Sequence, residues 1–419
     1  MSIDRRMLLE AGAAFSGAGL VGVLGFPIRS LAQDRGTIRF TPEFDLSVFD
    51  PIVNTGLSTL QHGYMVYDTL FALDSTYIPQ PQMIRSYTLS PDKLAYDFVL
   101  RSGLKFHDGT PVRGVDCAAS IRRWGARDVI GRTMMKRVVD IVPRGDGFTI
   151  KLSQPYPILI SALAKISSNV CFIMREKEAL TDPNTAVTEI IGSGPFKFNR
   201  GELVPGAKVV YEKFKDYVPR SEPANGYAGG KVVKVDRVEW VIIPDAATQV
   251  NAFMAGEIDF LSGPPLEKLG VLSGNRRVTI TDINTQGWFA YLRTNALHPP
   301  FNDPRARQAL AHMISQKDFM SVAAGPKSNW NECWEFLVCG SQMGNASGIG
   351  GYQSPNPALA RKLLAESGYK GDPIVVLNPT DNQILGGIAE LLIDVLRSNG
   401  VKVEPRSGDL ATEIGRAHV

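Results

Sequence analysis

Residues 98–112 read FVLRSGLKFHDGTPV, and this stretch says the most about how the chain folds. It starts within Leu94–Leu100, where large apolar side chains alternate with smaller or polar ones. That alternation predicts a strand with one buried face. Gly103, Gly109 and Pro111 then indicate closely spaced turns. The stretch therefore predicts a strand that leaves its sheet through a tightly turned loop.

On both sides of this stretch, helical and strand patterns follow one another. Apolar residues with helical spacing predict helices at residues 57–70, 115–124 and 246–255. Short β-rich runs predict strands at residues 37–40, 148–152, 209–211, 238–243, 258–261 and 287–293. This succession predicts an α/β fold.

A further helix is indicated after residue 300. Asn302 or Asp303 can cap its start, and Pro304 suits the first turn of a helix. Its apolar stripe continues to Ile314, and Gly325 lies past its end.

The last part of the chain predicts a helix and then a strand–helix–strand unit. Asn356 can cap the helix, and Gly368 ends it. The unit combines strands at 374–377 and 401–403 with an amphipathic helix at 384–396. A helix that connects two strands in this way favours parallel strand pairing.

The composition is that of a soluble globular protein. The chain has 419 residues, 44% hydrophobic and 21% charged, and a formal net charge of +3. This length is typical of two or three domains. Lysine and arginine are scattered along the chain, whereas a nucleic-acid-binding protein usually has a basic patch. We therefore expect no nucleic-acid partner.

The N-terminus resembles an export signal. Arg5 and Arg6 precede residues 11–28, which are uncharged and include five glycines. Ser30–Ala32 then provides the small residues that a signal peptidase prefers. Paired arginines before a weakly hydrophobic segment are typical of twin-arginine signals. The sequence predicts a signal peptide over 1–32 and a periplasmic protein; a retained membrane anchor is the alternative.

Four cysteines allow one short disulfide. Cys333 and Cys339 lie six positions apart in a loop-like stretch, and such a pair can join in an oxidising compartment. A zinc site is the alternative, but the spacing is not CxxC and no histidine is near. Cys117 is expected as a small buried residue in a helix.

The stretch at 98–112 closely resembles the signature of the peptide-, nickel- and opine-binding proteins, solute-binding protein family 5. Further segments resemble the same family in the same order, namely Tyr67–Leu70, Ile191–Phe196, Asp245–Asp259, Pro300–Leu310 and Ala360–Gly368. Each match alone is weak, but an ordered set is specific.

The resemblance implies a two-lobe periplasmic-binding-protein fold of the class II type, with an extra subdomain in the first lobe. The lobe I core would comprise residues 33–75 and 192–285, the extra subdomain 76–191, and lobe II 286–405. The resemblance also implies a monomer that delivers solute, a peptide or similar small molecule, to an ABC permease with ATPase subunits.

In the family the chain returns from the second lobe to complete the first. Here it stops at Val419, so we expect an incomplete second lobe. Residues 413–419 match one reading frame of a common sequencing-adapter oligonucleotide, so we interpret 406–419 as a non-native tail.

Five residues are candidates for contact with solute. Where the resemblance places the cleft, the sequence has Asn54, Thr55 and Gly56 after the first strand, and Trp288 and Tyr291 at entry to the second lobe. Aromatic and polar groups of this kind suit a solute site. Trp288 as ordinary core is the alternative. No cofactor or metal is expected.

Two other functions remain as hypotheses. An exported hydrolase would use His107 and Asp108, but His-Asp-Gly is also a common turn sequence. The five histidines have no ligand-like spacing, and the sequence contains no GxSxG, HExxH or P-loop motif, so we do not expect an enzyme. A sensory ligand-binding module would bind solute in the same way as an importer component.

Overall fold

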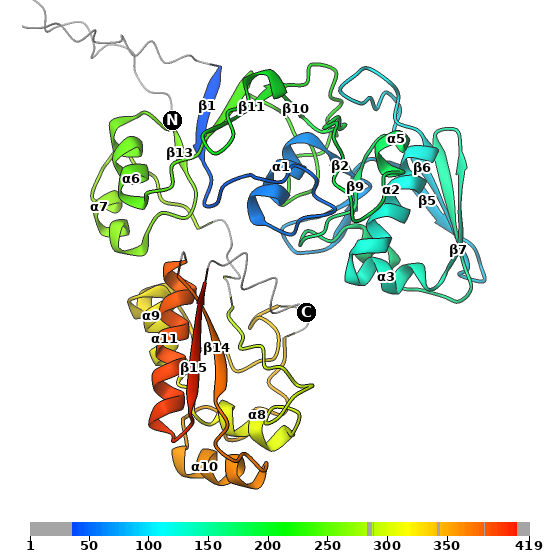
Figure 1. The fold of residues 1–419 in the computed structure, drawn as a ribbon. Helices are drawn as coiled ribbons and strands as arrows, with labels where there is room; N and C mark the ends of the chain where they lie inside the picture. The colour runs from blue at the N-terminus through cyan, green and yellow to red at the C-terminus, as the bar shows by residue number, and fades with distance from the viewer. Residues whose placement is uncertain (1–35, 283–286, 288, 342–343, 381, 409–419) are drawn as a thin grey trace, which may run out of the picture. The chain divides into compact units, whose positions relative to one another are not determined.

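The computed structural model describes residues 36–408 except 283–286, 288, 342–343 and 381 (Figure 1). By its internal contacts the chain forms two compact units. The first runs to Ile242 and includes Glu257–Phe260, and the second comprises Ile243–Gly256 and the chain from Leu261 onward. The predicted signal peptide and residues 409–419 of the predicted tail lie outside the described residues, and the predicted lobe limits stay predictions.

The first unit is built around a mixed five-stranded sheet. Its order is β10 (Phe196–Phe198), β11 (Lys208–Lys213), β12 (Arg237–Val241), β1 (Thr37–Thr41) and β13 (Phe260–Leu261). Strands β1 and β12 run parallel, and β11 runs antiparallel to both β10 and β12. Their inward side chains, among them Tyr211 and Trp240, are buried.

The predicted strand at 94–100 is confirmed as part of a four-stranded antiparallel sheet. The sheet order is β5 (Ile84–Leu89), β6 (Ala95–Leu100), β8 (Gly147–Leu152) and β7 (Val138–Arg144). Tyr96, Phe98 and Leu100 are buried, and the residues between them are half-buried, as alternation requires. Helix α2 (Gly114–Arg127) packs against this sheet.

The remaining elements of the first unit are short. They are α1 (Leu57–Val66), β2 (Asp68–Thr69), β3 (Phe71–Leu73), β4 (Pro79–Pro81), α3 (Val129–Met135), α4 (Leu159–Leu163), β9 (Phe172–Ile173), α5 (Glu176–Ala179) and the 3₁₀ turn η1 (Arg200–Glu202). Strand β2 pairs with β9, and β3 pairs with β4.

Helix α1 ends at Val66, so the prediction that it reaches residue 70 is wrong. The carbonyl oxygen of Val66 accepts a hydrogen bond from the Gly194 N–H at 2.8 Å. A Cβ at Gly194 would lie 2.6 Å from the Val66 carbonyl carbon, so only glycine allows this approach. The chain then becomes extended at Tyr67 and enters β2.

The second unit includes a small parallel sheet, and α11 packs against both of its strands. Its elements are α6 (Ala246–Ala255), η2 (Leu266–Lys268), α7 (Leu269–Ser273), α8 (Pro304–Ala311), α9 (Gln316–Ala324), η3 (Lys327–Asn329), α10 (Pro357–Glu366), β14 (Ile374–Pro379), α11 (Gln383–Ser398) and β15 (Val403–Gly408). Parallel pairing of β14 with β15 confirms the predicted strand–helix–strand unit.

Two predictions in the second unit are wrong. The helix expected from Pro304 past Ile314 is two helices, because the Ser315 hydroxyl caps a new start by accepting a hydrogen bond from Asp318 N–H. The strand expected at 287–293 is absent from the described residues of that range. A strand needs a pairing partner as well as alternation, and this segment belongs to no sheet of the described chain.

Among the residues that the structure describes, none of the helices is long and apolar enough to cross a membrane.

Candidate functional site

The candidate residues Asn54, Thr55 and Gly56 form the loop that enters helix α1. Thr55 and Gly56 are exposed, and Asn54 is half-buried. The side-chain oxygen of Asn54 accepts a hydrogen bond from the Gly56 N–H at 2.6 Å, which closes a tight turn. Gly56 is the N-cap of α1, and no side chain caps this helix. The loop therefore presents an uncapped helix N-terminus beside exposed backbone.

A buried ion pair fixes the start of this loop. The Arg123 side chain on α2 binds the Asp50 carboxylate at 2.8 and 3.2 Å, and both side chains are at most 1% exposed. The same carboxylate accepts hydrogen bonds from the N–H groups of Ile52 and Val187, both at 2.9 Å. A buried charge pair is stable only when its remaining hydrogen-bonding groups are satisfied in this way.

A single amide holds the next part of the loop. The side-chain nitrogen of Asn169 donates to the carbonyl oxygens of Pro51 and Ile52 at 3.0 Å and of Asn54 at 3.3 Å. Asn169 is only 8% exposed. Its backbone carbonyl oxygen accepts a hydrogen bond from the Trp124 indole N–H at 2.8 Å. Sequence reasoning missed this residue, because no local pattern identifies a contact across more than one hundred positions.

The other two candidates are not part of this loop. Tyr291 belongs to the second unit, where its side chain is 75% exposed and its ring lies 6.1 Å from that of Phe289. Trp288 lies outside the described residues. The structure thus places three of the five candidates in one loop.

His107 has a structural role in the first unit. Its Nδ1 accepts a hydrogen bond from Gly192 N–H at 3.3 Å, and its Nε2 donates to the Gly194 carbonyl oxygen at 3.1 Å. Burial lowers the pKa of His107 to about 4, although the bond to Gly194 opposes this shift. The imidazole is therefore neutral near pH 7, and both of its nitrogens hold the glycine turn that ends α1.

Asp108 has different partners from His107. One of its oxygens accepts hydrogen bonds from the N–H and hydroxyl of Thr110 at 3.0 and 2.6 Å. The other forms an ion pair with Arg175 at 2.6 Å. A base and its orienting carboxylate should share a hydrogen bond. The geometry matches the turn interpretation of His107-Asp108-Gly109 rather than the hydrolase hypothesis.

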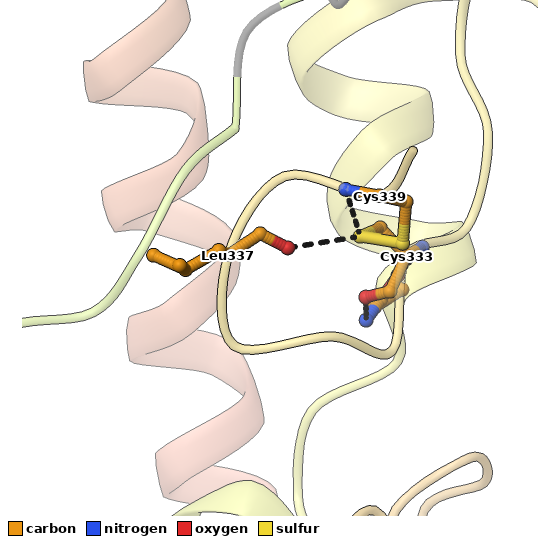
Figure 2. Close-up of a disulfide and its surroundings, with 4 residues drawn as sticks. Cys333, Leu337 and Cys339 are labelled. Carbon is orange, nitrogen blue, oxygen red and sulfur yellow. Dashed lines mark hydrogen bonds between the residues drawn. A yellow bond between two sulfur atoms is a disulfide. The ribbon is translucent and has the colours of Figure 1, made fainter. Parts of the chain in front are cut away.

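Cys333 and Cys339 form a disulfide in the structure, which closes a small loop in the second unit (Figure 2). The side chain of Gln316 accepts from Cys333 N–H at 2.9 Å and donates to the Cys333 carbonyl oxygen at 2.6 Å. The loop is therefore fixed to the start of α9. Phe336 in this loop is 95% exposed.

Cys117 and Cys171 are free thiols in the first unit, and both are buried. Burial raises the pKa of each thiol, so neither is a ready nucleophile. Among the described residues, no group of three or more His, Cys, Asp or Glu side chains could hold a metal ion.

Comparison with known proteins places these features in context. Residues 79–417 match the model of the bacterial extracellular solute-binding proteins, family 5 Middle. A protein of Sinorhizobium fredii named as a probable peptide ABC transporter periplasmic-binding protein is 39% identical over 99% of this chain and 78% of its own length. The glutathione-binding protein GsiB of Pectobacterium atrosepticum is 25% identical over 98% of this chain and 74% of its own length.

Solved structures share the fold at lower identity. The binding protein AgaA of A. tumefaciens R10, in complex with agropinic acid, aligns with a TM-score of 0.73 and 24% identity, covering 91% of this chain and 74% of its own. A dipeptide-binding protein of Pseudoalteromonas sp. SM9913, in complex with Met-Leu, aligns with a TM-score of 0.68 and 20% identity, covering 91% of this chain and 77% of its own.

Proposed function

The chain belongs to family 5 of the bacterial extracellular solute-binding proteins, and on that premise we propose that its solute is a peptide or a peptide-like small molecule. It is the solute-binding component of an ABC importer. The name of the 39% identical relative, which refers to peptide transport, supports the proposed solute class. The glutathione named for GsiB is itself a small peptide and supports the same class.

We place part of the solute site at Asn54, Thr55 and Gly56. The supporting observation is that α1 has no side-chain cap and that its N-cap residue, Gly56, is exposed, with Ser58 and Thr59 buried behind it. The first N–H groups of a helix lack partners within it, and together with the helix dipole they favour a negative group. A peptide carboxylate is such a group. Trp288 and Tyr291 remain proposed contacts from the second lobe.

The variant Gly56→Asp tests this placement. An aspartate at an N-cap accepts hydrogen bonds from the first turn and stabilises a helix, but here it would occupy the N–H groups and repel a carboxylate. We expect isothermal titration with di- and tripeptides to show affinity at least about tenfold weaker than that of Gly56→Ala. Gly56→Ala is the matched control, because a Cβ at this position lies 2.8 Å from the Asn54 side-chain oxygen and both variants must displace that oxygen. The added carboxylate is then the only difference between the two variants, and Gly56→Asp should bind more weakly than Gly56→Ala.

Two results would contradict these proposals separately. Unchanged peptide affinity in Gly56→Asp would remove the solute from this loop. No binding of any peptide, opine, sugar or metal by the folded parent protein would overturn the solute class itself.

We further propose that the protein is exported by the twin-arginine route and acts as a periplasmic monomer. The paired Arg5 and Arg6 before an uncharged segment support this route. Replacing both with lysine should leave the protein in the cytoplasm in cell fractionation, and unchanged export would argue against the route. Light scattering of the purified protein would test the monomer.

The relatives are binding proteins, and we propose that this chain likewise performs no chemistry on its solute. Its partners would be a permease and ATPase subunits in the inner membrane. The predicted lobe I core at 33–75 and 192–285, extra subdomain at 76–191 and lobe II at 286–405 are part of the same proposal. Solute recovered intact after prolonged incubation would support the absence of turnover.

A further inference from the structure

Asn169 occupies an unusual position behind the proposed solute loop. Its side-chain NH₂ has two hydrogens, yet three carbonyl oxygens, those of Pro51, Ile52 and Asn54, lie within 3.3 Å. At least one hydrogen is therefore shared between two oxygens. These three carbonyls all point toward one buried group, which fixes the backbone that leads into Thr55 and Gly56.

Asn169 is itself held from α2. The indole N–H of Trp124 donates to the backbone carbonyl oxygen of Asn169 at 2.8 Å, and Trp124 is fully buried. The neighbouring residue on the helix, Arg123, binds Asp50 at the start of the same loop. Two adjacent α2 residues thus fix the loop at successive points, one through Asn169 and one through an ion pair.

We infer that Asn169 is a positioning residue for solute binding, which acts through the backbone at 51–54 and does not touch the solute. Its burial behind the loop keeps it from the exposed face that Thr55 and Gly56 present. A loop that is already ordered loses less freedom when solute binds, so affinity depends on this support. The inference rests on the proposed function of the loop.

The variant Asn169→Asp tests the role most directly. It keeps the shape of the side chain but replaces the donor with an oxygen that faces three carbonyl oxygens. We expect peptide affinity to fall by about tenfold or more in isothermal titration, measured well below the unfolding temperature of every variant. Asn169→Ala should show a smaller loss in the same direction.

Ser120→Ala is the matched control. Ser120 lies on α2, the helix that also carries Arg123 and Trp124. Its buried hydroxyl accepts a hydrogen bond from Met174 N–H at 2.9 Å, but this hydroxyl has no hydrogen bond to the loop. This variant should lose stability and keep its peptide affinity. Hydrogen exchange gives a second measure, since the backbone amides of residues 52–57 should exchange faster in Asn169→Ala and at the parent rate in Ser120→Ala.

The outcomes separate this inference from the proposal beneath it. If the parent binds peptides and Gly56→Asp does not, but Asn169→Asp binds as well as Ser120→Ala, the positioning role is wrong and the site stands. If Gly56→Asp also binds normally, the site is wrong. If the parent binds no peptide, the proposed function fails first.

Discussion

The two units have interiors built from side chains of different size. In the first, aromatic rings fill the core, with Phe98 stacked on Phe148 at 4.9 Å between ring centres. The buried cluster described in the second unit has no aromatic member, and Ala306, Ala309 and Ala360 in it are at most 1% exposed. Large rings fill the interior of the first unit, whereas the small alanine side chains of the second unit let α8 and α10 pack closely. One interior should therefore be sensitive to lost volume and the other to added volume.

Removing a ring from the first unit should have the largest effect. Phe148 is 1% exposed, and Phe148→Ala would leave a cavity beside Phe98. We expect the free energy of unfolding to fall by about 3–5 kcal/mol in urea denaturation. Phe148→Leu retains most of the volume and should cost clearly less. Equal losses in the two variants would show that volume is not what this core requires.

Adding volume should break the second unit. Ala309 is fully buried on α8, so Ala309→Leu would push α8 and α10 apart. We expect a loss of up to about 3 kcal/mol by the same measurement. Gln308→Leu is the control, because it adds the same side chain at the adjacent exposed position and should change stability by less than about 0.5 kcal/mol. If Ala309→Leu is neutral, the contrast between the two interiors is wrong.

We expect the disulfide to stabilise the second unit and not the first. Closing the short loop between Cys333 and Cys339 reduces the freedom of the unfolded chain. For a loop of this length the stabilisation is about 2 kcal/mol, so Cys333→Ser with Cys339→Ser should lower stability by that amount. Thermal unfolding of the parent with and without reductant provides a second test. A parent that is insensitive to reductant would contradict the prediction.

Acid should weaken the first unit through two buried histidines. Burial lowers the pKa of His62 to about 3 and that of His107 to about 4, from an ordinary value of 6.5. As the pH falls, the histidines of the unfolded chain are therefore protonated before those of the folded protein. The free energy of unfolding then decreases as the pH drops from about 6.5 toward 4. At pH 5.5 each histidine should lower the free energy of unfolding by about 1 kcal/mol relative to its value at neutral pH. His107→Gln should reduce this pH dependence, and an unchanged slope would contradict the assignment.

Most of the local structure could be predicted from residue patterns. Alternation identified β6, and Asn356, Pro357 and Gly368 marked the limits of α10. The predictions were wrong where contacts other than the helix's own apolar spacing determine where a helix begins or ends. Apolar spacing continues past Val66, but the close approach of Gly194 ends α1 there. The Ser315 cap divides a stripe that looked continuous.

The candidate site was predictable only in part. The resemblance pointed to residues 54–56, but nothing near them in the sequence identifies what holds them. Arg123 lies 73 positions from Asp50, and Asn169 lies 118 from Pro51. Buried arginine and asparagine look like surface residues in a linear pattern, because their partners appear only when the chain folds.

The contacts of Arg123 and Asn169 bear on how such proteins can be recombined. A chimera that moves residues 76–191 of this chain into a relative carries both side chains, but it leaves behind Asp50 and the carbonyls of Pro51, Ile52 and Asn54 that they bind. The residues that must be exchanged together are therefore discontinuous in sequence and include the loop before α1. Exchanges that respect only the contiguous segment would separate a charge from its counter-ion in the interior.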